Sequence, residues 1–189
     1  MDVTNNHEKA SLFVLEAKQP LRSLPLSEDM LEALADSEIV NYAPGVLSVV
    51  CDWMDLQHTH SFSIQVTNTK TCYLISSSSR LSCLEQIPSL MAWVASDEPH
   101  FCLDINEQGS DLRIEFSRLG EKITHCCIED HWNSGVRVDG DWENSAYSLT
   151  NCCTAIANEM TRIAIAMNSK IEQFPAFRDW CIKCGFELT

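Results

Sequence analysis

Residues 148–174 read SLTNCCTAIANEMTRIAIAMNSKIEQF, and this stretch decides the fold. Its apolar side chains follow one another at spacings of four, three, four, four and three residues: Ile156, Met160, Ile163, Met167, Ile171 and Phe174. Because an α-helix completes one turn in about 3.6 residues, these side chains share one face. The spacing predicts one helix from about 148 to 174 that packs this stripe against a sheet.

Three further helices are predicted from similar patterns. After Pro175, the spacing of Phe177, Trp180, Cys181 and Cys184 predicts a short helix, with Gly185 as its C-terminal cap. A helix over 28–37 follows Ser27, which is a typical N-cap. A helix over 84–95 follows the pattern Ser-x-x-Glu at 82–85, which is a capping box.

Strand patterns fill the middle of the chain. The break at 43–45 (Ala-Pro-Gly) is followed by apolar or alternating runs that predict strands at 46–54, 61–66, 71–75, 101–105, 112–116 and 123–132. Residues 133–147 are polar and predict a surface loop with a short strand at 136–138. The sum is an N-terminal arm over 1–26 and a single α+β domain over 27–189. Its roughly six-stranded, mostly antiparallel sheet carries helices on one face and a long C-terminal helix.

The charge of the chain excludes some classes of partner. The 189 residues include 27 Asp and Glu against 13 Lys and Arg, a formal net charge of −14. Such a chain repels phosphates, and its basic residues form no stripe, so we expect no direct nucleic acid binding. No apolar run reaches the roughly 20 residues of a membrane span, and the N-terminus is unlike a signal peptide. We therefore expect a cytoplasmic protein that does not bind membranes.

Ten cysteines raise the question of metal or redox chemistry. In the cytoplasm thiols stay reduced, so their even number does not predict disulfides. Cys181-x-x-Cys184 lies on the apolar face of a predicted helix, which favours core packing over a metal site or a redox pair. The adjacent pairs at 126–127 and 152–153 place one thiol on each side of a strand or at adjacent positions on a helix, which suits packing better than pairing.

Histidines offer two other chemical interpretations. His58 and His60, with Asp52 and Asp55, could bind a metal on one strand face, but a solvated strand end or loop is favoured.

His125 or His131, beside Glu129 and Asp130, could serve as the base for a cysteine nucleophile in an enzyme. The motifs of nucleotide-binding, zinc-peptidase and serine-hydrolase sites are absent from the sequence, so we expect neither a cofactor nor a catalytic site.

Two acidic regions are the candidate partner-binding surfaces. The first joins the acidic residues of 28–38 to Asp52 and Asp55, and no Lys or Arg occurs between Arg22 and Lys70. The second combines acids with tryptophans: Glu129, Asp130, Trp132, Asp139, Asp141, Trp142 and Glu143. Acids beside exposed aromatic residues are typical of an interface with a basic partner, although tryptophans that fold back on the core would leave an ordinary solvated loop.

The order of predicted elements from about 44 to 174 resembles that of small bacterial immunity proteins. It comprises the meander over 46–75, the helix LEQIPSLMAWVAS, the strands HFCLDI, LRIEFS and ITHCCIEDHW, and the long C-terminal helix. The layout resembles the branches of this family that protect cells against contact-dependent inhibition and against wall-associated toxins. The resemblance implies a non-catalytic cytoplasmic inhibitor that binds and neutralises a cognate toxin C-terminal domain, expected to be basic.

Two alternatives remain open at this point. One is an enzyme that uses Cys and His, which would need a thiol and an imidazole to converge in a pocket. The other is a structural subunit of a larger assembly, which would be favoured by exposure of the apolar stripe over 156–174.

Overall fold

The computed structural model describes residues 12–21, 25–58, 60–65, 72–74, 77–107, 110–130, 136–137 and 142–186. Its helices are α1 (Glu28–Ala35), α2 (Ser37–Val40), α3 (Ala43–Gln57), α4 (Ser77–Val94), α5 (Ala146–Met167) and α6 (Pro175–Lys183), with a 3-10 turn at Ile171–Gln173. Its strands are β1 (Phe13–Ala17), β2 (His60–Gln65), β3 (Cys72–Leu74), β4 (His100–Glu107), β5 (Ser110–Leu119), β6 (Lys122–Asp130), β7 (Val136–Arg137) and β8 (Trp142–Asn144).

The strands form two sheets, so the α+β class is confirmed but the prediction of one six-stranded sheet is wrong. The smaller sheet has the order β1-β2-β3. The larger has the order β4-β5-β6-β7, with β8 also paired to β6. Every pairing is antiparallel. The long helix α4 separates the two groups of strands in the chain.

The predicted strand at 46–54 is the helix α3. Its polar positions Ser48 and Asp52 are four residues apart, and the apolar residues between them are buried around the helix. The valines in 46–54 favour a strand, and Pro44-Gly45 before them favours a break in the chain. Proline is instead well suited to the first turn of a helix, where its missing N–H is not needed, and Pro44 lies in the first turn of α3. Gly45 permits the close approach of α2, because a Cβ there would lie 3.0 Å from the Ile39 carbonyl oxygen.

The remaining predicted helices are present with different bounds. Ser27 caps α1 as predicted, accepting a hydrogen bond from the Met30 N–H. Helix α4 begins at Ser77, so Ser82 lies inside it and caps nothing. Helix α5 ends at Met167 rather than at 174, because the backbone becomes extended at the C-cap Asn168, whose side chain accepts from the Lys170 N–H. Gly185 follows α6 with a φ of +79°.

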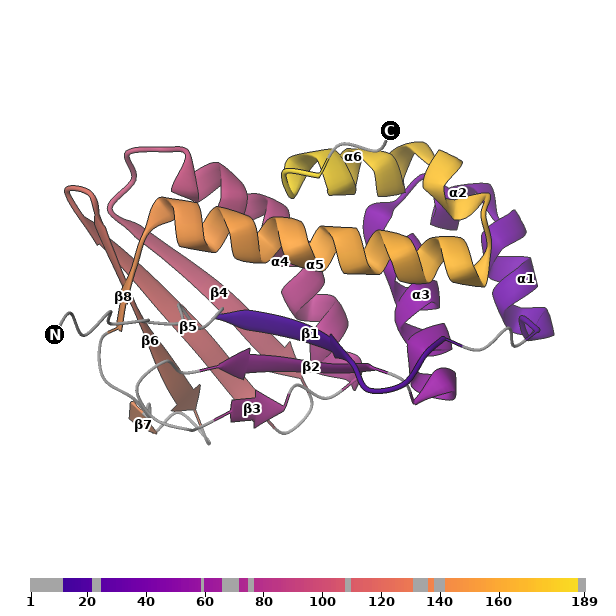
Figure 1. Ribbon diagram of the computed structural model, residues 1–189, viewed down its shortest axis with the longest axis horizontal. Helices are drawn as coiled ribbons and strands as arrows, with labels where there is room; N and C mark the ends of the chain where they lie inside the picture. The colour runs from indigo at the N-terminus through magenta and orange to yellow at the C-terminus, as the bar shows by residue number, and fades with distance from the viewer. Residues whose placement is uncertain are drawn as a thin grey trace, which may run out of the picture.

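Helix α5 runs along most of the molecule (Figure 1). The larger sheet lies toward one end, α1, α2 and α3 lie at the other end, and α6 lies beside α5. The predicted stripe from Ile156 to Ile171 is buried between these layers, together with Trp53, Phe116 and Phe177. No helix among the described residues is long and apolar enough to cross a membrane.

Part of the predicted N-terminal arm belongs to the smaller sheet. Strand β1 pairs with β2 from Phe13 opposite Ile64 to Ala17 opposite His60. The outer edge of β1 meets α5, where the Cys152 thiol accepts from the Phe13 N–H at 3.2 Å and donates to the Phe13 carbonyl at 3.1 Å. The chain from Leu12 onward is thus tied to the body of the protein, with Leu12 and Phe13 buried.

Candidate functional site

The first predicted acidic region lies on α1, α2 and α3. Ser27 begins α1, so Glu28 and Asp29 occupy its first turn, where the helix dipole favours carboxylates. Asp36 caps α2 by accepting from the Glu38 N–H at 2.8 Å. We call the α1–α3 acidic surface the exposed carboxylates of these helices: Glu28, Asp29, Glu32, Asp36, Glu38 and Asp52.

Large apolar side chains are exposed among these carboxylates. Leu31 is 52% exposed on α1, Tyr42 is 61% exposed before α3, and Leu56 is 58% exposed near the end of α3. Leu31 is three residues after Glu28, and Leu56 is four residues after Asp52, so each shares a helix face with an exposed carboxylate. Charge and apolar area therefore coincide on the same helices.

The two acids predicted on α3 have different surroundings. Asp55 accepts from Arg80 of α4 at 2.9 Å, and the Arg80 side chain is only 5% exposed. Asp52 lies on the exposed face of α3. Partial burial, with a smaller contribution from the charge of Asp55, raises the pKa of Asp52. Asp55 thus anchors α4 to α3, while Asp52 remains available to a partner.

The second predicted acidic region is described only through its strands. Glu129 lies on β6 opposite Leu112 of β5, and Asp130 lies opposite Asp111. Glu143 of β8 lies opposite Thr124 of β6, and Trp142 lies opposite His125. Thr124 and Glu129 are five residues apart, so the backbones of Glu129 and Glu143 are separated by roughly 17 Å along β6. Trp132, Asp139 and Asp141 lie outside the described residues.

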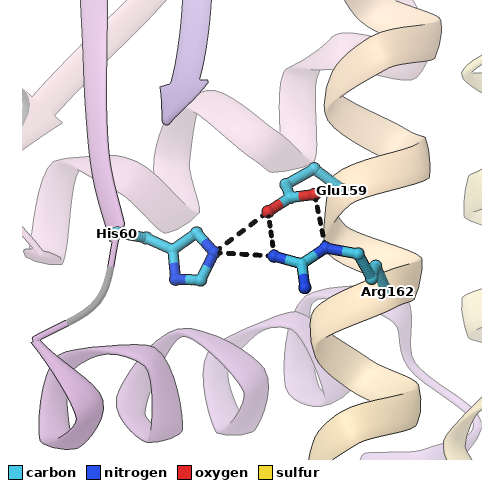
Figure 2. A network of polar contacts seen from close by, with 3 residues as sticks. All are labelled: His60, Glu159 and Arg162. Atoms are coloured by element: carbon cyan, nitrogen blue, oxygen red, sulfur yellow. Dashed lines mark hydrogen bonds and ion pairs between the residues drawn. The ribbon is translucent and has the colours of Figure 1, made fainter. Parts of the chain in front are cut away.

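A network of polar contacts that the sequence patterns did not predict joins β2 to α5 (Figure 2). The His60 side chain is fully buried, and its Nε2 lies 3.0 Å from Glu159 Oε1. Arg162 donates to both Glu159 oxygens, at 2.6 and 2.8 Å, and its Nη2 lies 3.4 Å from His60 Nε2. Burial is the largest influence on His60 and lowers its pKa, so at neutral pH the imidazole is uncharged and Nε2–H donates to Glu159.

This network removes His60 from the metal site considered above. His58 is the exposed left-handed C-cap of α3, with a φ of 51°, whereas His60 points inward from β2. The preference for a solvated position is therefore wrong for His60. Within the described residues, no group of three or more His, Cys, Asp or Glu is arranged to hold a metal ion. The sequence signal for this network is the Glu159–Arg162 spacing of three residues on a predicted helix, which favours an ion pair.

The cysteine and histidine arrangement of a thiol enzyme is not assembled among the described residues. Cys181 and Cys184 are both buried in the core, as predicted. Burial raises the pKa of Cys51 to about 12 and that of Cys152 and Cys181 to about 11, which disfavours the reactive thiolate. His125 is buried against Phe116, with ring centroids 5.8 Å apart, and burial lowers its pKa to about 4. His131 lies outside the described residues.

No protein-family model, no curated protein and no solved structure matches this chain.

Proposed function

We propose that this protein is a non-catalytic, cytoplasmic immunity protein that neutralises a cognate toxin domain through its α1–α3 acidic surface. The observation that carries the proposal is the coincidence of six exposed carboxylates with three exposed apolar side chains on α1, α2 and α3 and at the N-cap of α3. The sequence places no Lys or Arg from 23 to 69. A basic toxin domain is the partner that fits this composition.

The two kinds of side chain have different parts in such an interface. Exposed carboxylates accelerate the encounter with a basic partner and make it sensitive to salt. Apolar side chains such as Leu31 and Leu56 provide the area that must be desolvated for tight binding. In this proposal the carboxylates contact the basic residues of the toxin that its anionic substrate would otherwise contact.

The two alternative functions receive less support. A thiol enzyme needs a thiolate beside an imidazole, and the raised pKa values of the buried thiols are unfavourable for that chemistry. A structural subunit would be favoured by an exposed stripe on α5, but Ile156, Met160 and Ile163 are buried within this chain. The binding protein therefore remains the stronger proposal.

Co-expression tests this function directly. The probe is the C-terminal domain of the protein encoded immediately upstream, produced alone and with this chain. We expect growth to be arrested by the domain alone and restored by co-expression, with the two chains co-purifying. The double variant Glu32→Lys and Asp52→Lys should weaken the complex at least ~10-fold, mainly through slower association.

The control variant carries Glu98→Lys and Glu121→Lys, which change the net charge equally but lie before β4 and between β5 and β6, away from the α1–α3 acidic surface. It should restore growth as well as the native chain. Equal weakening by both double variants would assign the effect to net charge and would refute this surface as the site. An upstream domain that neither arrests growth nor binds the chain would refute the immunity function.

A further inference from the structure

Strand β4 is an edge of the larger sheet. It pairs with β5 on one side, from His100 opposite Ser117 to Glu107 opposite Ser110. Its opposite side has no strand partner among the described residues. His100, Cys102 and Asp104 are all exposed along it. An exposed edge strand presents unpaired backbone groups to any extended chain that can reach it.

Two side chains of α4 close part of this edge, and one of them is Ser82, whose hydroxyl donates to the Asp104 carbonyl at 3.4 Å. The Asp104 N–H donates to Gln86 Oε1 of α4 at 3.0 Å, and Gln86 Nε2 donates to the Asp104 carbonyl. The Gln86 amide thus makes both hydrogen bonds that a residue on a neighbouring strand would make. The contact also shows that the backbone groups of Asp104 point away from β5.

The backbone groups of His100 and Cys102 point to the same edge. In an antiparallel ladder the N–H and C=O of one residue point to the same side, and the side alternates from residue to residue. The Pro99 carbonyl accepts from the Arg118 N–H of β5 at 2.8 Å, as this alternation requires. The backbone N–H and C=O groups of His100 and Cys102 are therefore available at this edge, since neither residue has a backbone partner in the described part of the chain.

The surface beside this open edge is hollow and acidic. A hollow of about 430 Å³ is lined by His100, Phe101, Cys102, Glu115, Phe116 and Ser117. Glu115 and Asp104 contribute negative charge there, and Arg113 lies 3.3 Å from Glu115. Two further exposed acids, Asp97 and Glu98, precede the strand. Acidic side chains therefore outnumber basic side chains around this edge.

We propose that the β4 edge from His100 to Cys102 is a second interaction site, which binds an extended segment of a partner protein as an added strand. Backbone hydrogen bonds would supply affinity, and lysine or arginine at alternate positions of the segment would lie over Asp104 and Glu115. The site ends at Asp104, because the backbone groups of Asp104 are already hydrogen-bonded to Gln86. A second copy of this chain is disfavoured as the occupant, because each carries a net charge of −14. The site is separate from the α1–α3 acidic surface and does not rest on the immunity function.

Peptide titration followed by NMR tests the proposal. The probe is the acetylated and amidated peptide KVKVKVK. Two controls are KPKPKPK, which has the same charge but cannot form a strand, and EVEVEVE, which forms strands but has the opposite charge. We expect KVKVKVK to shift the amide signals of residues 100–104 with a dissociation constant of about 1 mM or tighter. At saturation it should slow hydrogen exchange of the His100 and Cys102 amides at least ~10-fold, since the added strand covers them.

Variants of the edge make the test specific. Cys102→Pro removes an N–H that the sheet does not use, so the fold should survive while peptide binding weakens at least ~10-fold. Cys102→Val keeps the N–H and should bind normally. Gln86→Ala should bind more tightly, because the Asp104 N–H becomes available. Binding of KPKPKPK equal to that of KVKVKVK, full binding by Cys102→Pro, or absence of binding would each overturn the proposal. Concentration-dependent dimers paired through β4 would assign the edge to a second copy and overturn the basic partner.

Discussion

His125 lies on β6 opposite Phe116, with its side chain almost completely buried. Burial lowers its pKa to about 4 in the folded protein, because the imidazolium would lose its hydration there. In the unfolded chain the pKa of a histidine is about 6.5. As the pH falls, the unfolded chain therefore binds a proton before the folded protein does. The contribution of His125 to stability is complete above pH 6.5 and is lost progressively as the pH falls to 4.

We expect this proton uptake to reduce the free energy of unfolding by about 3 kcal/mol between pH 6.5 and pH 4. His125→Leu removes the titrating group and retains an apolar side chain of similar size. Urea unfolding of both proteins at intervals of pH measures the effect, and the difference between them isolates His125 from the carboxylates. Parallel pH profiles for the two proteins would contradict the pKa assigned to His125.

At the scale of single elements, sequence patterns succeeded where one face is apolar and the ends carry local signals. The Ser27 cap, the alternation on β5 and the Gly185 turn are all visible in short stretches of sequence. They failed for α3, whose apolar residues surround almost the whole helix because it is buried on several sides. A short buried helix and a buried strand give similar runs of apolar residues, so periodicity alone does not separate them.

The end of α6 provides a test at this scale. Gly185 has a positive φ, its N–H donates to the Ile182 carbonyl, and the Phe186 N–H donates to the Cys181 carbonyl. These two hydrogen bonds form a Schellman motif, which requires a left-handed residue at Gly185. A Cβ at this position would also lie 2.9 Å from Thr154 Oγ1, whose hydroxyl donates to the Cys184 carbonyl.

We expect Gly185→Ala to reduce the free energy of unfolding by about 2 kcal/mol, from backbone strain together with the contact to Thr154. Gly120→Ala is the matched control, since Gly120 has a φ of +62° but no atom within 4 Å of the added Cβ. It should cost about 1 kcal/mol from backbone strain alone. Urea unfolding of both variants measures the difference, and equal losses would show that the contact with Thr154 relaxes at no cost.

For the whole molecule, the sequence predicted the α+β class and the long helix but not how the strands divide into two sheets. The division depends on contacts between distant residues, which local periodicity does not contain. The same limit applies to the candidate sites. The carboxylates of α1 to α3 were visible as a stretch without Lys or Arg, whereas the closing of the β4 edge by Gln86 depends on residues 18 positions apart.

Among the described residues, the smaller sheet is hydrogen-bonded to α5 near both ends of the β1–β2 pair. Cys152 binds the edge of β1 at Phe13, and Glu159 accepts from His60 at the start of β2. The two attachments are seven residues apart on α5, which is about two turns of helix. Residues 99 positions apart in the chain are thereby joined through a buried imidazole.

Removal of the Glu159 carboxylate tests this attachment. We expect Glu159→Ala to reduce the free energy of unfolding by about 2 kcal/mol, because the buried His60 N–H loses its acceptor and Arg162 loses its ion pair. Hydrogen exchange should accelerate in β2 more than in β5, since the smaller sheet loses a hydrogen bond to α5. Arg162→Ala keeps the His60–Glu159 contact and removes a half-exposed side chain, so its loss should stay below about 1 kcal/mol. If the two variants lost equal stability, or if exchange rose equally in both sheets, the His60–Glu159 contact would not be what holds β2 to α5.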